Sequence, residues 1–289
     1  MKLLVKLNLV LLVVFAIALA GTAQLSWTLL QKNAQTEIAD TARLLMDAAL
    51  AARGYTSKEV SPLLDTQLKY TFLPQVIPAY SATEVFADLR KKHPEFSYKE
   101  AALNPTNPRD RAVEWEADIV NQYRNGTTGE IAGTRSTPTG DSFYVSRPIR
   151  ITDPACLRCH STIDVAPRTL LERYGPSNGF GWQLNDVIGA QIISVPTSVP
   201  LGRAKEAFTV FMASMAAVFV LIGIVLNVMI WRVVTRPVVM LSNLADRISL
   251  GELEVTEPRS NRRDEIGILT KSIGRMRASL VHAMRMLES

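Results

Sequence analysis

The chain has 289 residues, of which 47% are hydrophobic, and its formal net charge is +5. This length suggests one or two domains. No patch of basic and aromatic residues accompanies the positive charge, so we expect no nucleic-acid partner. We also expect no enzyme, because no nucleophile–base pair, phosphate-binding loop or carboxylate motif stands out from the background.

The chain begins with an apolar segment. Leu7–Ala20 carries no charge and follows Lys2 and Lys6. The small residues in Ala18–Gly21 resemble the cleavage site of a signal peptide. The helical pattern that continues directly afterwards instead favours a retained signal anchor. We therefore predict that residues 1–24 form a first transmembrane helix.

A second apolar run predicts another membrane crossing. Phe208–Trp231 has no charge and is long enough to span a bilayer, so we expect a transmembrane helix over residues 207–231. Arg232 and Arg236 follow it directly, and the lysines precede the first run. The positive-inside rule then places both termini in the cytoplasm and residues 25–205 on the outer side of the membrane. In a bacterium this arrangement predicts an inner-membrane protein whose residues 25–205 lie in the periplasm.

Helical patterns fill the first part of this external region. From Gln24 to Arg53, apolar residues recur every three to four positions, which predicts one helix. Another helix is expected over Ala82–Lys92. It ends before His93–Pro94, because a residue that precedes proline disfavours the helical conformation. Arg109–Tyr123 resumes a helical pattern.

Strand signals follow the helices. Ser142–Ile151 alternates apolar and polar residues, and Asp186–Val195 is the strongest strand candidate in the chain. The predicted fold class is α+β, an antiparallel sheet of moderate size with flanking helices. Two transmembrane helices and a cytoplasmic helical pair complete the prediction.

The segment between these strands carries the most specific motif. Cys156-Leu157-Arg158-Cys159-His160 is the attachment signature of a c-type haem, and its two cysteines are the only ones in the chain. Each thiol would form a thioether with a vinyl group, and the imidazole would become an axial ligand of the iron. A disulfide, a thioredoxin-like redox pair or half of a zinc site is the alternative. A zinc site needs more ligands nearby, and a thioredoxin motif needs a βαβ unit.

We therefore predict one covalent haem c per chain, with Cys156 and Cys159 as anchors and His160 as the proximal ligand. The second axial position is open. Met46 is the predicted metal ligand there, although a methionine on an apolar helix is more often core filling. His93 is a rival, with a surface role at a helix end as its alternative. A water-filled or open position that binds a gas is the third possibility.

Four side chains near the motif have two interpretations each. Arg147 and Arg150 would pair with the haem propionates or be solvated strand residues. Phe180 and Trp182 would line the haem pocket or simply pack a turn.

Two amphipathic helices follow the second apolar run. The first carries an apolar stripe with Leu241 and Ile248 and ends at Gly251, and Asp264-Glu265 begins the second. The apolar positions of the second helix keep heptad spacing: Ile266, Leu269, Ile273, Met276, Leu280, Ala283 and Leu287. One chain cannot bury both stripes. A homodimer that forms a parallel four-helix bundle is therefore predicted.

These motifs resemble known families. The external region, over roughly residues 40 to 200, resembles the haem c-binding, PAS-like periplasmic sensor domains of bacterial chemoreceptors, histidine kinases and nucleotide cyclases. The segments that carry this resemblance are Asn104–Asn107, Pro148–His160, Tyr174–Gly175, Gly179–Gly181 and Gly189–Pro196. Residues 232–289 resemble a HAMP domain, with a generic membrane-proximal coiled coil as the alternative. The HAMP resemblance implies a relay that passes a helix displacement or rotation between two packed arrangements.

Together these features predict a membrane-bound haem c sensor that converts a periplasmic redox or gaseous-ligand signal into a HAMP conformational change. The sequence stops at Ser289 without a kinase, cyclase or methyl-accepting region. We therefore expect the output to reside in a cytoplasmic signalling partner supplied in trans. The main alternative is a membrane-anchored monohaem cytochrome for electron transfer. A structural adaptor with a vestigial haem site is the third reading.

Overall fold

The computed structural model describes residues 3–138, 140–255 and 262–288. Two compact units are distinguished. One is Thr28–Ala207, and the other combines Met1–Trp27 with Phe208–Ser289.

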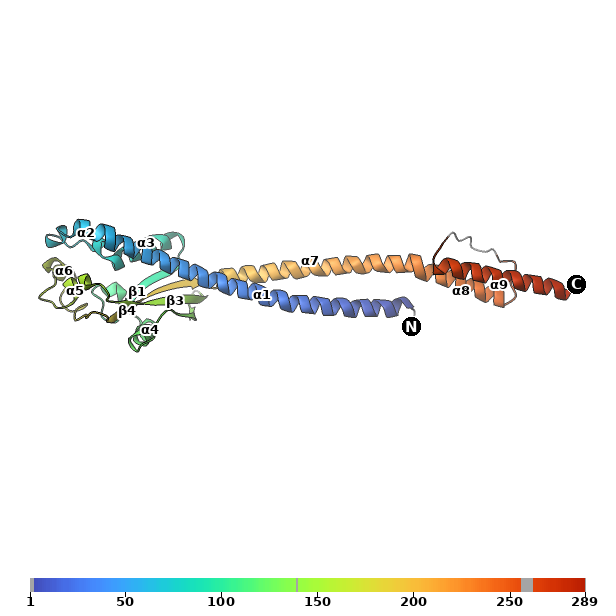
Figure 1. The fold of residues 1–289 in the computed structure, drawn as a ribbon, viewed down its shortest axis with the longest axis horizontal. Helices are drawn as coiled ribbons and strands as arrows, with labels where there is room; N and C mark the ends of the chain where they lie inside the picture. The colour runs from blue at the N-terminus through green and yellow to red at the C-terminus, as the bar shows by residue number, and fades with distance from the viewer. Residues whose placement is uncertain (1–2, 139, 256–261, 289) are drawn as a thin grey trace. The chain divides into compact units, whose positions relative to one another are not determined.

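A four-stranded antiparallel sheet forms the centre of the Thr28–Ala207 unit (Figure 1). In spatial order its strands are β1 (Ser97–Ala102), β4 (Val187–Pro196), β3 (Gly140–Arg150) and β2 (Ile131–Thr137). The two strands expected from the sequence correspond to β3 and β4, which pair along most of their length. The predicted α+β class is confirmed. β1 and β2 are strands that the sequence pattern does not reveal.

Helices cover both faces of this sheet. Figure 1 shows α1 (Leu3–Tyr55) and α3 (Pro78–Lys92) on one side and α4 (Glu114–Arg124) on the other. The first face is closed by the cluster Ile38, Ala42, Met46, Ala49, Phe86, Val145, Ile193 and Val195. The second is closed by Ala101, Ile119, Val120, Tyr123, Val187, Ala190 and Ile192. Successive residues of a strand point to opposite faces, so a strand buried on both sides is mostly apolar, as β4 is apart from Gln191 and Ser194.

α1 contains the predicted Gln24–Arg53 helix without a break and continues into a π-helical turn, η1 (Thr56–Val60). The helix expected over Ala82–Lys92 begins earlier, at Pro78, because proline suits the first helical turn. The remaining short elements are α2 (Ser61–Leu64), η2 (Gln67–Lys69), η3 (Pro74–Val76), η4 (Pro108–Asp110), η5 (Pro154–Cys156), α5 (Leu157–His160) and α6 (Arg168–Tyr174).

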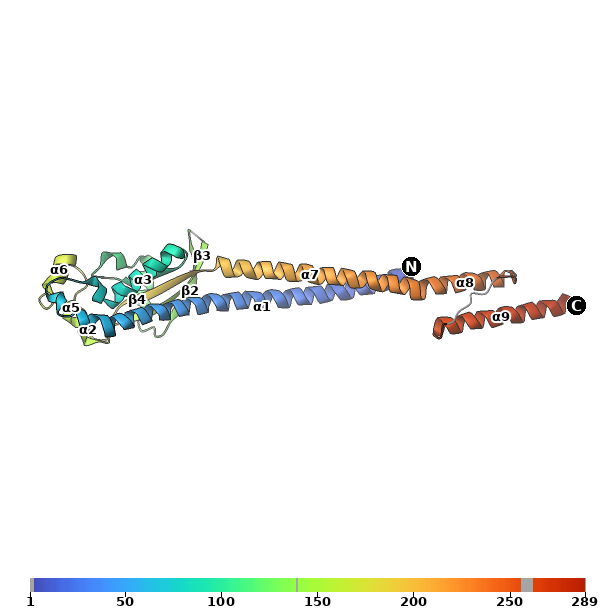
Figure 2. The same ribbon diagram turned by 90° about the horizontal axis from the view of Figure 1, so that it is seen from above.

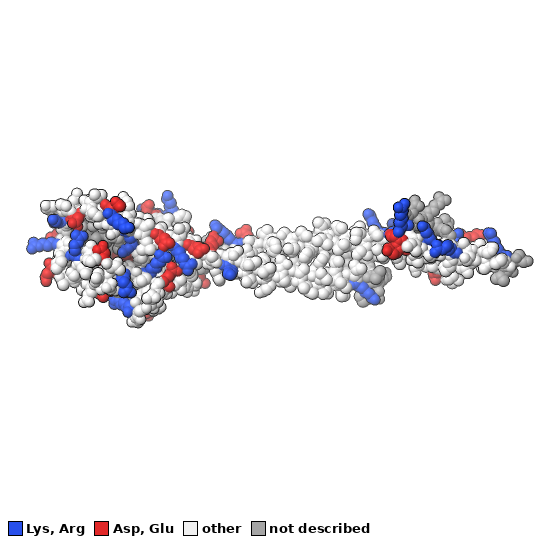
Figure 3. All heavy atoms as spheres, viewed as in Figure 1, with Lys and Arg blue, Asp and Glu red and all other residues white. Residues whose placement is uncertain are grey.

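Two long apolar helices belong to the second unit. They are the N-terminal part of α1 and α7 (Ser198–Ile230), and both are long and apolar enough to cross a membrane. Phe15 stacks on Phe219, with 4.7 Å between the ring centroids. Figure 3 shows no charged side chain along these apolar stretches on the face drawn. The two helices are consistent with membrane anchoring.

A helical pair follows α7. A π-helical turn, η6 (Trp231–Thr235), leads into α8 (Arg236–Ser249), and α9 (Glu265–Glu288) lies beyond the connector. Within one chain the pair buries Leu241, Ile248, Val255 and Ile273. Connector residues 256–261 and the side chain of the predicted stripe residue Leu287 lie outside the described part of the chain.

Glycines shape both ends of this connector. Gly251 has φ +91° directly after α8, a conformation that glycine adopts without steric cost. Asp264 caps α9, where the backbone N–H of Gly267 donates to Asp264 Oδ1 at 3.0 Å. A Cβ at Gly267 would lie 2.2 Å from the Arg262 carbonyl oxygen, so only glycine fits there.

Candidate functional site

The Cys156–His160 motif lies on one short helical segment. The Asp153 side chain accepts from the Ala155 backbone N–H at 2.8 Å and so initiates η5, which α5 continues. Positions i, i+3 and i+4 of a helix share one face. Cys156, Cys159 and His160 occupy these positions, so local structure presents two thiols and one imidazole on the same side.

The two thiols are free and half-buried. Burial raises the pKa of Cys156 and of Cys159, and for Cys156 the nearby Asp153 carboxylate adds to the effect. Redox-active and nucleophilic cysteines have the opposite property, a lowered thiol pKa. A zinc site would need a group of at least three His, Cys, Asp or Glu side chains, and the described residues contain none.

His160 is held in a defined tautomer. Its Nδ1 lies 2.7 Å from the Gly179 carbonyl oxygen and 3.3 Å from Thr106 Oγ1. A carbonyl oxygen only accepts hydrogen bonds, so Nδ1 donates and Nε2 keeps its lone pair. Burial lowers the pKa of His160 and keeps the ring neutral. A histidine that ligates a metal is normally oriented in this way through its other ring nitrogen.

Trp182 fixes the plane of the imidazole. Its ring stacks on the His160 ring with a centroid separation of 3.8 Å and an interplanar angle of 15°. Two backbone bonds hold this arrangement, from Gly181 N to the Ser161 oxygen at 2.8 Å and from Trp182 N to the His160 oxygen at 3.1 Å. The loop that supplies the Gly179 carbonyl is thereby tied to the end of α5.

Gly179 is required by close approach. Its φ is +82°, and a Cβ there would lie 1.9 Å from Thr106 Oγ1. Two sequence segments that carried the family resemblance, Asn104–Asn107 and Gly179–Gly181, therefore meet at the imidazole of His160. Sequence reasoning identified these segments but not that contact, which depends on the tertiary fold.

Met46 lies elsewhere. Its side chain is fully buried in the apolar cluster between α1 and the sheet. That cluster contains neither of the two cysteines nor His160. These surroundings favour core filling, the alternative that the sequence left open, and an iron-ligand role for Met46 stays a prediction.

His93 is not brought to His160 either. Its side chain is 52% exposed, with Nδ1 3.7 Å from Glu95 Oε1. It precedes β1, whereas Thr106, which touches His160, follows that strand. Six extended residues span about 20 Å, so His93 and Thr106 lie at opposite ends of β1.

The two arginines near the motif have different surroundings. Arg147 is engaged by carboxylates, with Nη1 2.6 Å from Asp47 Oδ1 and Nη2 3.4 Å from Glu130 Oε2. Arg150 donates to the Asn185 carbonyl oxygen at 2.7 Å and lines a pocket of about 530 Å³.

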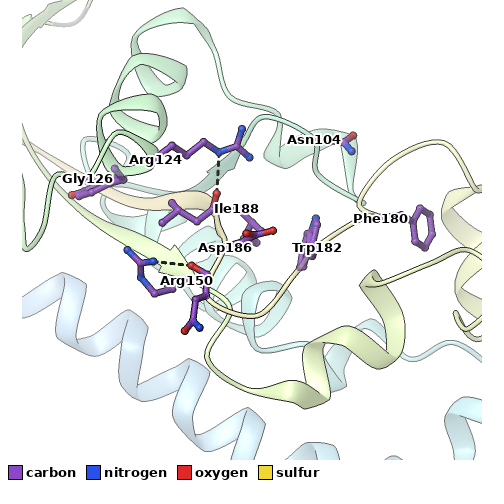
Figure 4. Close-up of a pocket in the computed structure, with 12 residues that line it drawn as sticks. Asn104, Arg124, Gly126, Arg150, Phe180, Trp182, Asp186 and Ile188 are labelled. Atoms are coloured by element: carbon purple, nitrogen blue, oxygen red, sulfur yellow. Dashed lines mark hydrogen bonds between the residues drawn. The ribbon is translucent and has the colours of Figure 1, made fainter.

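This pocket lies on the α4 side of the sheet (Figure 4). Tyr123 and Arg124 of α4 contribute to its wall, and Arg124 Nε donates to the Val187 carbonyl oxygen at 3.0 Å. Trp182 also lines it, so the aromatic ring that stacks on His160 faces a solvent-accessible space. Phe180 and Trp182 both line this pocket, but Cys156, Cys159 and His160 are not among its lining residues, so the role of the two aromatic residues in a haem pocket stays a prediction.

A buried polar cluster near the motif was missed from the sequence. Arg53 Nη1 donates to Glu100 Oε2, and the Tyr98 hydroxyl donates to Glu100 Oε1 at 2.6 Å. The sequence signal for this cluster is the spacing of Tyr98 and Glu100, because residues two positions apart in a strand lie on the same face.

Comparison with known proteins gives two family matches. Residues 31–196 match the model of the Tll0287-like family, and residues 229–282 match the HAMP domain. A sensory transducer protein of Acetivibrio thermocellus is 41% identical over 73 residues, which are 25% of this chain and 13% of that protein. The crystal structure of the cyanobacterial heme-protein Tll0287 aligns with a TM-score of 0.43 and 16% identity, over 55% of this chain and 95% of that one.

Proposed function

We propose a sensory function on one premise: this chain belongs to the Tll0287-like family and carries a HAMP domain after its Tll0287-like domain. That architecture suggests a sensory transducer, and the relative that bears this name supports the suggestion. More specifically, we propose a membrane-bound haem c sensor. It converts a periplasmic redox or gaseous-ligand signal into a conformational change of the HAMP domain.

The observation that carries this proposal is the shared face of Cys156, Cys159 and His160. Both thiols are free to form thioethers, and His160 presents an unprotonated Nε2. These residues fit a haem c, with the cysteines as anchors and the histidine as ligand. Bound there, haem c supplies an iron that changes oxidation state or takes up a small gaseous molecule.

The surrounding residues prepare His160 for this role. The Gly179 carbonyl fixes the tautomer, burial keeps the ring neutral, and Trp182 holds its orientation. An imidazole whose tautomer and orientation are already fixed by its neighbours needs little reorganisation when it binds a metal.

The proposed arrangement in the cell follows the charge pattern. Residues 1–24 and 207–231 cross the inner membrane, residues 25–205 lie in the periplasm and residues 232–289 lie in the cytoplasm. α7 continues through η6 into α8, which gives the HAMP domain a direct helical connection to the second span.

The HAMP domain implies a signalling relay, typically in dimers. We propose a homodimer through α8 and α9, with output to a cytoplasmic kinase, cyclase or chemoreceptor-type partner in trans. An electron-transfer cytochrome would also use the haem site, but this function would not require a HAMP domain.

The proposal is tested with the haem-loaded full chain in nanodiscs. A spin label at Ser279→Cys on α9 reports the distance between the two copies by pulsed electron paramagnetic resonance. We expect this distance distribution to differ between the oxidised and reduced protein, and the difference to disappear in His160→Ala. If a chain without haem gave the same response to oxidant and reductant, the sensor proposal would be wrong.

A further inference from the structure

A buried ion pair joins α1 to the sheet beside the candidate site. Arg53, in the last turn of α1, donates to one carboxylate oxygen of Glu100 in β1, and the Tyr98 hydroxyl donates to the other. The side chains of Arg53 and Glu100 are only 23% and 5% exposed. Both carboxylate oxygens are thus bonded within the protein.

Stability alone does not explain this pair. Removing two charges from water costs several kcal/mol per ion, and apolar residues of similar volume often stabilise a core as well or better. A buried pair is best attested where it fixes the register of two elements or switches between two arrangements. Here the elements are α1 and β1.

Other ion pairs join α1 to residues elsewhere in the Thr28–Ala207 unit, called the sheet domain below, and these pairs are less buried. Arg43 pairs with Glu130, and Asp47 pairs with Arg147, but the α1 partners are 50% and 63% exposed. Exposed pairs contribute little and are screened by salt. Among the ion pairs of the described residues that join α1 to the sheet domain, Arg53–Glu100 is the most buried.

Three observations place this pair next to the cysteine motif. Arg158 Nη1 of α5 lies 3.4 Å from Asp65 Oδ1, directly after α2, and Figures 1 and 2 both show α5 beside α2, close to the end of α1. β1, which carries Glu100, leads to Thr106, and Thr106 contacts His160. Burial lowers the pKa of Arg53, but Glu100, Tyr98 and the Cys156 thiol together raise this pKa by more, so the net shift is upward.

A single helix, α1, contains both Arg53 and the first candidate membrane span. It is helical without interruption from Leu3 to Tyr55 and contains an apolar stretch long enough to span a bilayer. An altered attraction between Arg53 and Glu100 therefore acts on the same helix that contains the first candidate span. Interfaces of this kind shift between discrete packed states, because cores deform little.

We propose that the Arg53–Glu100 pair is the electrostatic link between the haem site and α1. This inference rests on the proposed haem function. A haem held by Cys156, Cys159 and His160 would lower the charge of the site by one unit when a one-electron reductant reduces it and is itself oxidised. Arg53 is then repelled less by the site, and Glu100 is attracted less, so the balance of forces across the α1–β1 contact changes.

The sign of each charge gives a sharp test. The haem-loaded full chain is titrated spectroelectrochemically as wild type, Arg53→Gln and Glu100→Gln. Loss of the positive Arg53 stabilises the oxidised site, so we expect a lower reduction potential. Loss of the negative Glu100 destabilises the oxidised site, so we expect a higher potential. Arg53→Lys keeps the charge and should remain close to wild type.

Arg43→Gln is the matched control, since it removes an exposed arginine of the same helix, and it should leave the potential unchanged. A merely structural role would destabilise both buried variants without shifting their potentials in opposite directions. In the Ser279→Cys label assay, Arg53→Gln should also reduce the redox-dependent change in distance while retaining full haem content.

Two results are decisive against the link. Shifts of the same sign, or none, in haem-loaded Arg53→Gln and Glu100→Gln would overturn this inference and leave the sensor proposal standing. A wild-type chain without covalent haem would overturn the proposed function and this inference with it.

Discussion

The sheet domain and the helical pair bury their apolar residues to very different extents. The Thr28–Ala207 unit closes a cluster on each face of its sheet with its own chain. The helical pair leaves much of its predicted stripe open, with Leu269 43%, Met276 45% and Leu280 42% exposed. One region buries its apolar residues within a single chain, whereas the other leaves apolar surface that the proposed dimer would cover.

This difference suits the two tasks that we propose. A closed core holds a ligand set in one geometry, as the bonds around His160 require. An open stripe that is shared between two copies has more than one way to pack, which is the property that a relay needs. The predictions below separate the two regions by damaging one and observing the other.

The largest expected effect follows removal of both cysteines. Cys156→Ala/Cys159→Ala should lose covalent haem completely, because no thioether can form, while the half-buried site tolerates the smaller side chains and the domain stays folded. Haem staining of a denaturing gel measures the first outcome and circular dichroism the second. Ser161→Ala is the neighbouring control and should retain its haem. Covalent haem in the double variant would contradict the assignment.

Damage to the open stripe should have the reverse pattern. Met276→Lys places a charge at the predicted dimer seam, and we expect loss of the dimer with unchanged haem content. Ala278→Lys introduces the same charge on the outer face of α9, two positions away, and should remain dimeric. Light scattering in nanodiscs or detergent measures the oligomeric state. A dimer that survives Met276→Lys would show that the stripe is not the interface.

Met46 tests whether the closed core supplies an iron ligand. If it only fills the core, Met46→Ala should cost about 2–5 kcal/mol of unfolding free energy. Met46→Leu should then cost less than about 1.5 kcal/mol. We expect Met46→Leu to keep the absorption spectrum of the wild type, because its surroundings are apolar. A changed spectrum of the oxidised and reduced Leu variant would instead identify Met46 as the ligand.

The smallest expected effect is a pH dependence of the haem-free domain. The pKa of His160 in the folded state is lowered from its ordinary value of 6.5 by burial, so the folded state binds fewer protons than the unfolded state. Stability should therefore fall as the pH drops through 6.5 toward the lower folded-state pKa. Urea unfolding of Cys156→Ala/Cys159→Ala across this range measures the slope, and adding His160→Gln should flatten it. An unchanged slope would mean that His160 is not the group responsible.

Local patterns predicted the longer helices, β3 and β4, because each pattern depends on neighbouring residues, whereas the short helices α2, α5 and α6 were not predicted. β1 was missed because two of its residues on the α1 face, Tyr98 and Glu100, are polar, which breaks the apolar alternation. Glu100 accepts hydrogen bonds from both Tyr98 and Arg53. β2 was missed because it is an edge strand of mostly small and polar residues, three of whose seven residues are exposed.

The prediction of the candidate site was also limited to what neighbouring residues reveal. The spacing of Cys156, Cys159 and His160 predicts a common role in holding a haem, and that role stays a prediction. The contacts that orient the histidine join Thr106 and Gly179, which are 73 positions apart in the chain. No periodicity in the sequence brings such positions together, and only the folded sheet does so.

The proposed sensor depends on one haem that is covalently attached at Cys156 and Cys159. A pyridine haemochrome spectrum of the purified, denatured full chain measures this attachment. We expect one haem per chain that resists extraction by acidified acetone and shows the α-band of a haem with thioether substituents. Haem that is fully extracted as protohaem, or no haem in protein made with an active cytochrome c maturation system, would contradict it.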